Sequence, residues 1–250
     1  MTAMKPHPGT ADGVAPPEDR RQRKARQTRE AMAAAAVTLI LERGLAAVTV
    51  EEIADRADVT RRTFSRHFSG KEDAALDFTR ADGARINAAL RARPIDEPPL
   101  LAYREAVGEW LAARQALGEA AYARWRSLLR LVDTEPTLFA AYERIRVDAQ
   151  DESVAIIADR LGTDPARDPR PAVVIGAAAG VLTAALRTWA REERDDAEAL
   201  PGHVNRAYDV LIEEARRTIN GGPADGRSAP APPESEQNHE HHREGPREHF

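Results

Sequence analysis

The sequence contains no cysteine among its 250 residues. Disulfides, thiolate metal ligands and cysteine nucleophiles are therefore excluded. Aromatic residues make up only 5% of the chain, whereas alanine is abundant. This composition favours packed helices over β-sheets, because alanine is the best helix former and the residues that favour strands are scarce. The expected fold is all-α.

Membrane and catalytic signals are also scarce. No uncharged apolar run reaches 18 residues, and the N-terminus lacks the apolar core of a signal peptide. We therefore expect a cytoplasmic protein without a membrane span. The chain has no HExxH, GxSxG or P-loop pattern, and its central part holds only two isolated histidines, His67 and His203. An enzyme needs a nucleophile with its base, a metal set or a phosphate loop, so we expect no catalysis, cofactor or metal.

The segment 49–68, TVEEIADRADVTRRTFSRHF, has the pattern of two short helices joined by a tight turn. Thr49 followed three residues later by Glu52 forms a capping box, which begins the first helix. Asp58 lies in the turn, where the backbone must adopt left-handed dihedral angles that Asp tolerates. Thr60 is a suitable N-cap for the second helix. The pattern predicts a helix-turn-helix.

The second helix would bury Phe64 and Phe68 and expose a basic face rich in hydroxyl groups. Such a helix fits the DNA major groove, where arginine pairs with guanine O6 and N7. A plain helical hairpin with a solvated charged face would give the same pattern. Residues 20–29 hold six basic and no acidic residues, although the net charge of the chain is −5. This local basic run favours DNA, but it could also be a solvated extension.

Residues 28–76 resemble the DNA-binding domain of the tetracycline-repressor (TetR) family. The matching positions are Gly44, Thr49, Val50, Ile53, Ala54, Val59, Thr63, Phe64, Phe68, Lys71 and Glu72. The resemblance places Arg61, Arg62 and Ser65 at base-contact positions. It places Thr63, His67 and Lys71 at phosphate-contact positions. The hydroxyls of Thr49 and Thr60, at helix N-termini, also suit phosphate oxygens.

Two positions depart from the family pattern. Ser65 stands where the family usually carries Tyr or another aromatic residue, which removes an apolar contact to the DNA. Asp58 replaces the usual turn glycine at a small cost in stability. After the hairpin, Ser69 and Glu72 predict a second capping box at the start of one helix over 71–92.

Further helices are expected from residue 99 to the stop signals after residue 161. Three segments here, DEPPL, LVDTEPTLFAAYERI and DRLGTDP, resemble the branch of the family with a mycofactocin-regulator-like C-terminal domain, which implies an acyl-CoA-like ligand. Aromatic residues gather in this region, either as ordinary core or as the wall of a pocket for a small apolar or amphipathic effector. The candidate pocket residues are Phe78, Trp110, Trp125, Leu128, Leu129, Phe139 and Tyr142. Arg114, Arg124 or Arg130 could meet an acidic head group of such a ligand, but each is expected at the surface.

Residues 171–191 are nearly all apolar, and residues 203–219 form an amphipathic helix. A helix that is apolar on all sides must be buried, either in its own protomer or against a partner. The family resemblance implies that these two helices make a four-helix homodimer interface. The predicted interface residues are Gly176, Gly180, Ala184, Val204 and Leu211. A two-fold dimer matches a palindromic double-stranded DNA operator.

The expected organisation is a disordered arm over 1–18, a helix-turn-helix domain over 19–70, a helical effector-binding and dimerisation domain over 71–220, and a disordered tail over 221–250. For the tail's His239, His241, His242 and His249 we expect no metal function. The predicted function is a DNA-binding repressor released by a small molecule. Open alternatives are an activator or architectural DNA-binding protein without an effector, and a protein-interaction module.

Overall fold

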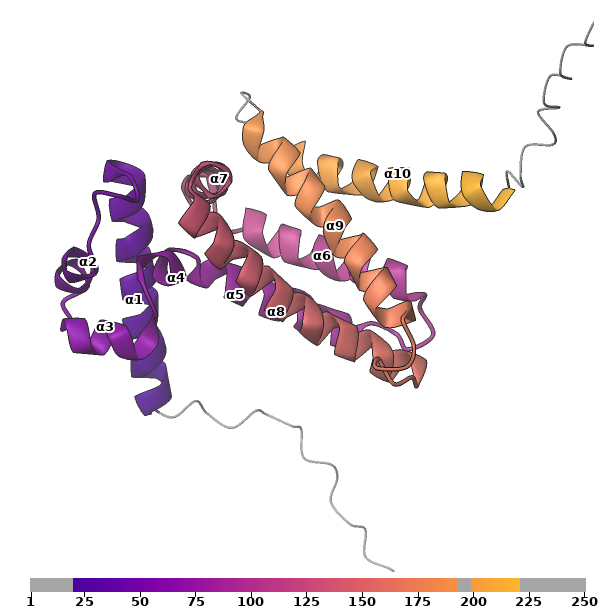
Figure 1. The fold of residues 1–250 in the computed structure, drawn as a ribbon, viewed down its shortest axis with the longest axis horizontal. Helices are drawn as coiled ribbons and strands as arrows, with labels where there is room; N and C mark the ends of the chain where they lie inside the picture. The colour runs from indigo at the N-terminus through magenta and orange to yellow at the C-terminus, as the bar shows by residue number, and fades with distance from the viewer. Residues whose placement is uncertain (1–19, 193–198, 221–250) are drawn as a thin grey trace, which may run out of the picture. The chain divides into compact units, whose positions relative to one another are not determined.

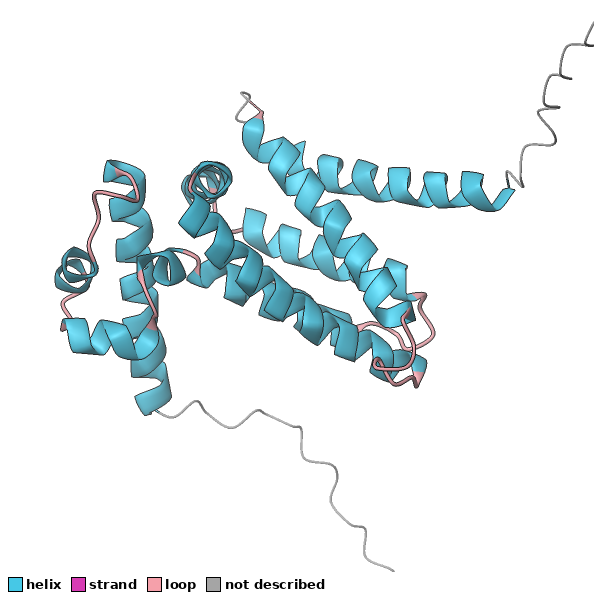
Figure 2. Ribbon diagram, in the orientation of Figure 1, coloured by secondary structure: helices cyan, strands magenta, loops and turns pink. Residues whose placement is uncertain are grey.

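The computed structural model describes residues 20–192 and 199–220, and every regular element in these ranges is an α-helix (Figure 1, Figure 2). This confirms the expected all-α fold. The helices are α1 (Arg20–Arg43), α2 (Val50–Arg56), α3 (Arg61–His67), α4 (Lys71–Ala75), α5 (Asp77–Ala92), α6 (Pro99–Gln115), α7 (Glu119–Thr134), α8 (Pro136–Leu161), α9 (Arg170–Arg191) and α10 (Ala199–Asn220). The predicted arm over 1–18 and tail over 221–250, with its histidines, lie outside the described residues.

Internal contacts divide the chain into a large unit, residues 1–211, and a small unit, residues 212–250. The large unit holds α1 to α9 and the first part of α10. The described part of the small unit is the end of α10, where Arg217 pairs with Glu213 and Glu214 at 3.2 and 2.8 Å. The boundary after residue 70 stays a prediction, because an apolar core runs across it.

This shared core joins the N-terminal helices to α7 and α8. From α1 to the residue after α4 it contains, among others, Met32, Ala36, Ile40, Ile53, Phe64, Phe68 and Leu76, all at most 3% exposed. From α7 and α8 it contains Leu128, Val132, Leu138 and Ile145. The helix-turn-helix therefore packs directly on helices of the C-terminal part of the chain.

A second apolar core lies among α5, α6, α7, α8, α9 and α10. Its centre is aromatic: the rings of Trp110 and Trp125 meet edge to face at 5.8 Å, and those of Tyr122 and Trp189 at 5.1 Å. Edge-to-face pairs of this kind contribute about 0.5–1.5 kcal/mol beyond their buried area. Phe78 packs against both cores and connects them.

The structure corrects the prediction of one helix over 71–92. α4 ends at Ala75, and Leu76, with φ −99° and ψ 11°, separates it from α5. Leu76 is fully buried, so packing in the shared core fixes the joint between the two helices. The expected capping box is replaced by another arrangement, in which the amide and hydroxyl of Ser69 donate to Asp73 Oδ2 at 2.9 and 3.0 Å.

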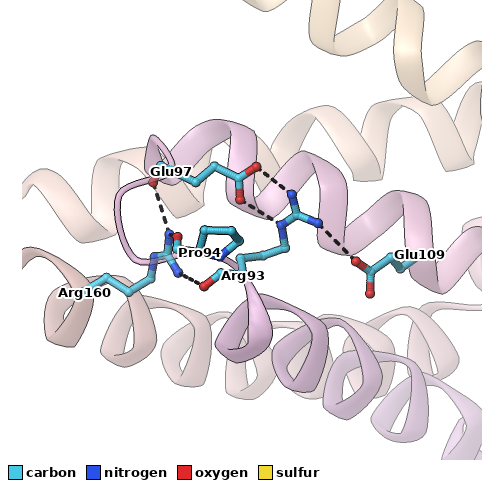
Figure 3. A network of polar contacts seen from close by, with 5 residues as sticks. All are labelled: Arg93, Pro94, Glu97, Glu109 and Arg160. Carbon is cyan, nitrogen blue, oxygen red and sulfur yellow. Dashed lines mark hydrogen bonds and ion pairs between the residues drawn. The ribbon is translucent and has the colours of Figure 1, made fainter.

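A polar network fixes the C-terminal end of α5 (Figure 3). The Arg160 guanidinium of α8 donates to the carbonyls of Arg93, Pro94 and Glu97 at 3.0, 2.6 and 3.1 Å. Arg93 donates to both Glu97 carboxylate oxygens at 2.8 and 2.7 Å and reaches Glu109 at 3.2 Å. The hydrogen bond from Arg93 lowers the pKa of Glu97. These contacts tie the turn after α5 to both α6 and α8.

By length and composition alone α9 could cross a membrane, whereas the sequence analysis expected no membrane span. In the structure one face of α9, with Ile175, Leu182 and Trp189, is buried in the second core. α9 is thus a core helix of the protomer. Its opposite face, which includes Gly176 and Gly180, is exposed.

The close approach of α5 and α8 gives a stability prediction. A Cβ added at Gly83 would lie 2.7 Å from the Ala149 Cβ, so one helix must shift. We expect Gly83→Ala to destabilise the protein by about 1–3 kcal/mol, as other overpacked sites do. Gly108→Ala on α6 is the matched control, because nothing lies within 4 Å of its added Cβ. The control should gain about 0.5–1 kcal/mol of helix propensity. Urea unfolding measures the free energy of unfolding of each variant. If Gly83→Ala stabilises the protein as Gly108→Ala does, α5 and α8 are not closely packed at this point.

Candidate nucleic-acid interface and effector cavity

Thr49 begins α2 with the predicted capping box. Its amide and hydroxyl donate to Glu52 Oε2 at 2.8 and 2.9 Å, and the Glu52 amide donates to Thr49 Oγ1 at 3.3 Å. The backbone hydrogen bond from Thr49 is the main reason why the pKa of Glu52 is lowered to about 2. The cap occupies the Thr49 hydroxyl, so a DNA phosphate would have to compete for it.

The turn between α2 and α3 also follows the prediction. Asp58 has a φ of 53°, in the left-handed region. The Val59 amide donates to the Ala54 carbonyl at 3.0 Å, which closes the turn. Thr60 is the N-cap of α3, and its Oγ1 accepts from the Thr63 amide at 3.1 Å.

α3 separates a buried face from an exposed one. Phe64 and Phe68 are buried with their ring centroids 5.5 Å apart. The exposed side chains are Arg61, Arg62, Ser65 and Arg66, and Thr63 and His67 are half-buried. Burial lowers the pKa of His67, so at neutral pH its imidazole is mostly uncharged. The structure therefore brings all the predicted α3 residues to one side of the helix or to its edges.

Arg61 has an acidic neighbour on α2. Its Nη1 lies 2.7 Å from Glu51 Oε1, with 73% of the Arg61 side chain and 52% of the Glu51 side chain exposed. An ion pair this exposed is worth at most about 1 kcal/mol. It would yield readily to a base or a phosphate.

Lys71 has a structural contact that the sequence did not reveal. Its Nζ donates to the carbonyls of Leu45 and Val48 at 2.7 and 2.9 Å, which closes the loop between α1 and α2. An ammonium carries three donors, so one remains for a phosphate.

Arg29 belongs to the basic run 20–29, yet its guanidinium is turned into the protein. It donates to Asp77 and to the carbonyl of His67, and its Cζ lies 4.3 Å from the centroid of the Phe68 ring. Sequence reasoning missed this role, because the run was interpreted as a uniform DNA-facing or solvated stretch.

A cavity of about 80 Å³ lies among α5, α6, α7, α8 and α9. The predicted residues Phe78, Trp110, Trp125, Leu129 and Tyr142 line it. Two predicted residues lie elsewhere. Leu128 is 1% exposed and belongs to the shared core, and Phe139 is 39% exposed at the surface of α8. A stripe of apolar residues does not show which of two cores each member faces.

Polar residues of this cavity were missed by the sequence reasoning. Among the described residues, three polar atoms of the lining make no short hydrogen bond: Thr79 Oγ1, Asp82 Oδ1, which has Arg85 Nη1 at 3.9 Å, and Trp110 Nε1, which lies near the Asp82 carboxylate. Burial raises the pKa of Asp82, against the opposing effects of Arg114 and of the nearby Trp110. Buried polar atoms of this kind are rare and call for a water or a ligand.

Arg114 corrects the expectation of a surface side chain. It is 7% exposed and forms an ion pair with Asp82, while its Cζ lies 4.2 Å from the centroid of the Trp125 ring. Removing one partner of such a buried pair would leave an uncompensated charge. Arg124 and Arg130 are exposed as predicted, and Arg130 donates to backbone carbonyls at the end of α9.

Two family models match the chain. Residues 33–75 match the model of "Bacterial regulatory proteins, tetR family", and residues 97–215 match that of the "MftR C-terminal domain". The first match runs from α1 to the end of α4 and includes the whole helix-turn-helix. The second covers most of the helices that surround the cavity.

The chain is also similar to individual proteins. The HTH-type transcriptional regulator TcmR of Streptomyces glaucescens is 36% identical over 197 residues, which are 78% of this chain and 87% of TcmR. Thermus thermophilus FadR, a TetR-family repressor solved in complex with lauroyl-CoA, has a TM-score of 0.47 at 21% identity, covering 82% of this chain and 98% of that one. Bacillus halodurans FadR has a TM-score of 0.45 at 17% identity, covering 76% and 96%. By its identity to TcmR and its two domain matches, this chain belongs to the TetR family of DNA-binding transcriptional regulators, which are not enzymes.

Proposed function

We propose that this regulator is a dimeric cytoplasmic repressor that leaves a palindromic operator when a small apolar or amphipathic molecule enters the cavity. One observation carries the proposal: α3 exposes Arg61, Arg62 and Ser65, while its other face is buried in a core shared with α7 and α8. The helix that would read DNA is thus packed on helices that also surround the cavity.

The exposed residues near the start of α3 are those that a recognition helix places against base edges. The forked guanidinium of Arg61 or Arg62 can donate to guanine O6 and N7 together. Thr60 and Thr63 at the same end of α3 suit backbone phosphates, which position a protein without specifying sequence.

Substitution of the two arginines tests this reading. Arg61→Ala and Arg62→Ala should each weaken operator binding by about 1–3 kcal/mol and relax specificity at one base pair. The operator would come from selection of random duplexes by the wild-type protein, with affinities measured by fluorescence anisotropy. Arg144→Ala, an exposed arginine of α8, is the control and should bind normally. A uniform loss over all sequences would overturn the base-contact assignment.

Lys71 should act on both stability and affinity. Lys71→Met keeps the apolar stem but removes the donors to the Leu45 and Val48 carbonyls, so we expect a loss of about 1–3 kcal/mol of stability. Loss of a phosphate contact should also weaken all duplexes alike and lower the salt slope by about one. Urea unfolding and titrations at several salt concentrations measure the two effects. Wild-type stability would show that the loop does not need Lys71.

The exposed face of α9 supports the dimer. Gly176, Gly180 and Ala184 recur every fourth residue and are exposed, and a Cβ added at either glycine meets nothing within 4 Å. A smooth stripe of this kind allows a second helix to approach closely. Val173 on the same helix is 65% exposed and adds an apolar side chain to this face.

The interface predicted on α10 needs one correction. Val204 is 3% exposed within the protomer and belongs to the second core, so it is not available to a partner. Leu211 is half-buried and stays in the proposal. The amphipathic pattern of α10 did not distinguish the face toward the protomer from the face toward a partner.

A charge in the α9 stripe should separate the dimer. Gly180→Glu adds a carboxylate where the protomer has open space, so we expect a folded monomer with at least tenfold weaker binding to the full operator. Analytical ultracentrifugation and circular dichroism measure the association state and the fold. Gly108→Glu on α6 is the matched control, since it is equally open in the protomer. If Gly180→Glu stays dimeric, α9 is not the interface.

The cavity suits an effector that is mostly apolar but carries a hydroxyl or similar group. Aromatic rings form much of its wall, Asp82 Oδ1 can accept a hydrogen bond, and Trp110 Nε1 can donate one. Its volume of about 80 Å³ is small, because ligand pockets usually measure about 300–1,000 Å³. A bulky effector would therefore prefer a wider conformation. A swing from 1% to 99% of that state requires a difference in affinity of about 5.5 kcal/mol.

The small cavity also favours the alternative, a DNA-binding activator or architectural protein without an effector. A screen of small aromatic and amphipathic compounds separates the two proposals when it records both melting temperature and release of the selected operator. Compounds that raise the melting temperature and release the DNA support the effector-controlled repressor. If no compound in the screen releases the operator, the result supports a DNA-binding protein without an effector.

A further inference from the structure

We propose that Arg29 and Asp77 form a positioning pair that fixes recognition helix α3 against the start of α5, and that Arg29 is not a DNA phosphate contact. The inference rests on the proposed role of α3 as the helix that reads DNA. It adds two residues, neither of which faces the DNA-reading side of α3, as determinants of specificity.

The guanidinium of Arg29, on α1, contacts two other segments of the chain, the start of α5 and the end of α3. Nε and Nη2 donate to Asp77 Oδ1 at 2.9 and 2.6 Å, and Nη1 donates to the His67 carbonyl at 2.8 Å. The guanidinium also lies beside the ring of Phe68, with Cζ 4.3 Å from its centroid. Only 32% of the Arg29 side chain and 17% of the Asp77 side chain are exposed. Charge-assisted bonds at such sites are stronger than those of exposed ion pairs.

The two acceptors of Arg29 lie at opposite kinds of helix end. His67 is the last residue of α3, where the carbonyls lack partners within the helix and favour a cation. Asp77 is the first residue of α5, where a carboxylate is favoured by the helix dipole. The next residues of α5, Phe78 and Thr79, already line the cavity. One guanidinium therefore joins the end of the reading helix to the beginning of a cavity helix.

A second polar link runs parallel to the first. The Asp73 carboxylate of α4 accepts from Ser69, just after α3, and pairs with Arg80 of α5 at 2.5 Å. Movement of α5 relative to α3 would thus strain two sets of charged contacts. The Arg29 link is the more easily tested, because only the planar guanidinium of arginine can donate to the Asp77 carboxylate and the His67 carbonyl at the same time.

The first test compares Arg29→Lys and Arg29→Gln with wild-type protein on the selected operator and on a scrambled duplex of equal length. Both variants should lose about two- to thirty-fold in the ratio of specific to non-specific affinity, the usual range for coupling residues. The slope of log affinity against log salt should not change even for the glutamine variant, because Arg29 neutralises no phosphate. Arg26→Gln, one turn earlier and 57% exposed, is the control and should lower the slope by about 0.9 if it meets a phosphate.

The second test uses the sign of the effect at Asp77. Asp77→Asn removes a negative charge, so electrostatics alone would strengthen binding to every duplex. The positioning role predicts weaker operator binding and a lower specificity ratio instead. Asp55→Asn, an exposed carboxylate of α2, is the matched control and should show only the electrostatic increase. The double variant Arg29→Gln/Asp77→Asn should be no worse than the worse single variant, because both break one link.

Partial unfolding would lower specific and non-specific binding alike and leave their ratio unchanged, so it cannot imitate the expected result. Full rescue of the ratio by Arg29→Lys, or stronger operator binding by Asp77→Asn, would overturn the proposal. Failure of the wild-type protein to select any duplex would instead overturn the proposed function itself.

Discussion

The helices that carry the DNA-reading face have no closed apolar core of their own, and the rest of the structure depends on this. α2 and α3 have seven residues each and α4 has five, too few to be stable as isolated helices. Their buried side chains share one core with Leu128 of α7 and Leu138 of α8. Packing of this kind is sensitive to small displacements, because protein interiors are close to crystal density.

Polar contacts hold α5 at both ends within this framework. Arg29 meets Asp77 at its start, and the network around Arg93 and Arg160 holds the turn after its end. Between these points α5 lines the cavity and approaches α8 closely at Gly83. A molecule that widens the cavity must therefore act against fixed ends and a tight helix contact. With this arrangement, ligand binding can switch α5 between two discrete positions rather than shift it gradually.

Two charged residues illustrate how the interior constrains binding. Asp82 and Arg114 are both under 10% exposed, and they form an ion pair beside the aromatic wall of the cavity. Each charge is tolerated only because the other is present. An effector that reaches Asp82 Oδ1 would meet a paired, nearly neutral site, which is consistent with an uncharged polar group.

The sequence predicted those features that arise within a few residues of chain. The Thr49–Glu52 cap, the left-handed Asp58 and the buried Phe64 are local, and each is confirmed. The break at Leu76 was missed because its cause is a core contributed by distant helices.

Side-chain roles set by distant partners could not be read from the sequence. Arg29 and Asp77 are 48 positions apart, and Asp82 and Arg114 are 32 apart. Helical periodicity shows that a face is apolar, but not which neighbour it meets. For this reason the sequence did not show that Leu128 packs in the shared core, that Phe139 lies at the surface of α8, or that Val204 faces the core of its own protomer.

Hydrogen exchange of the protein with and without its selected operator tests the central claim, that the DNA-reading face and the cavity helices are physically coupled. Linkage requires any coupling to act in both directions. The account predicts that operator binding slows amide exchange in α3 and also in α4, the first turns of α5 and the parts of α7 and α8 that enter the shared core. Protection confined to α1, α2 and α3 would contradict it, because the reading helices would then respond to DNA without involving the helices around the cavity.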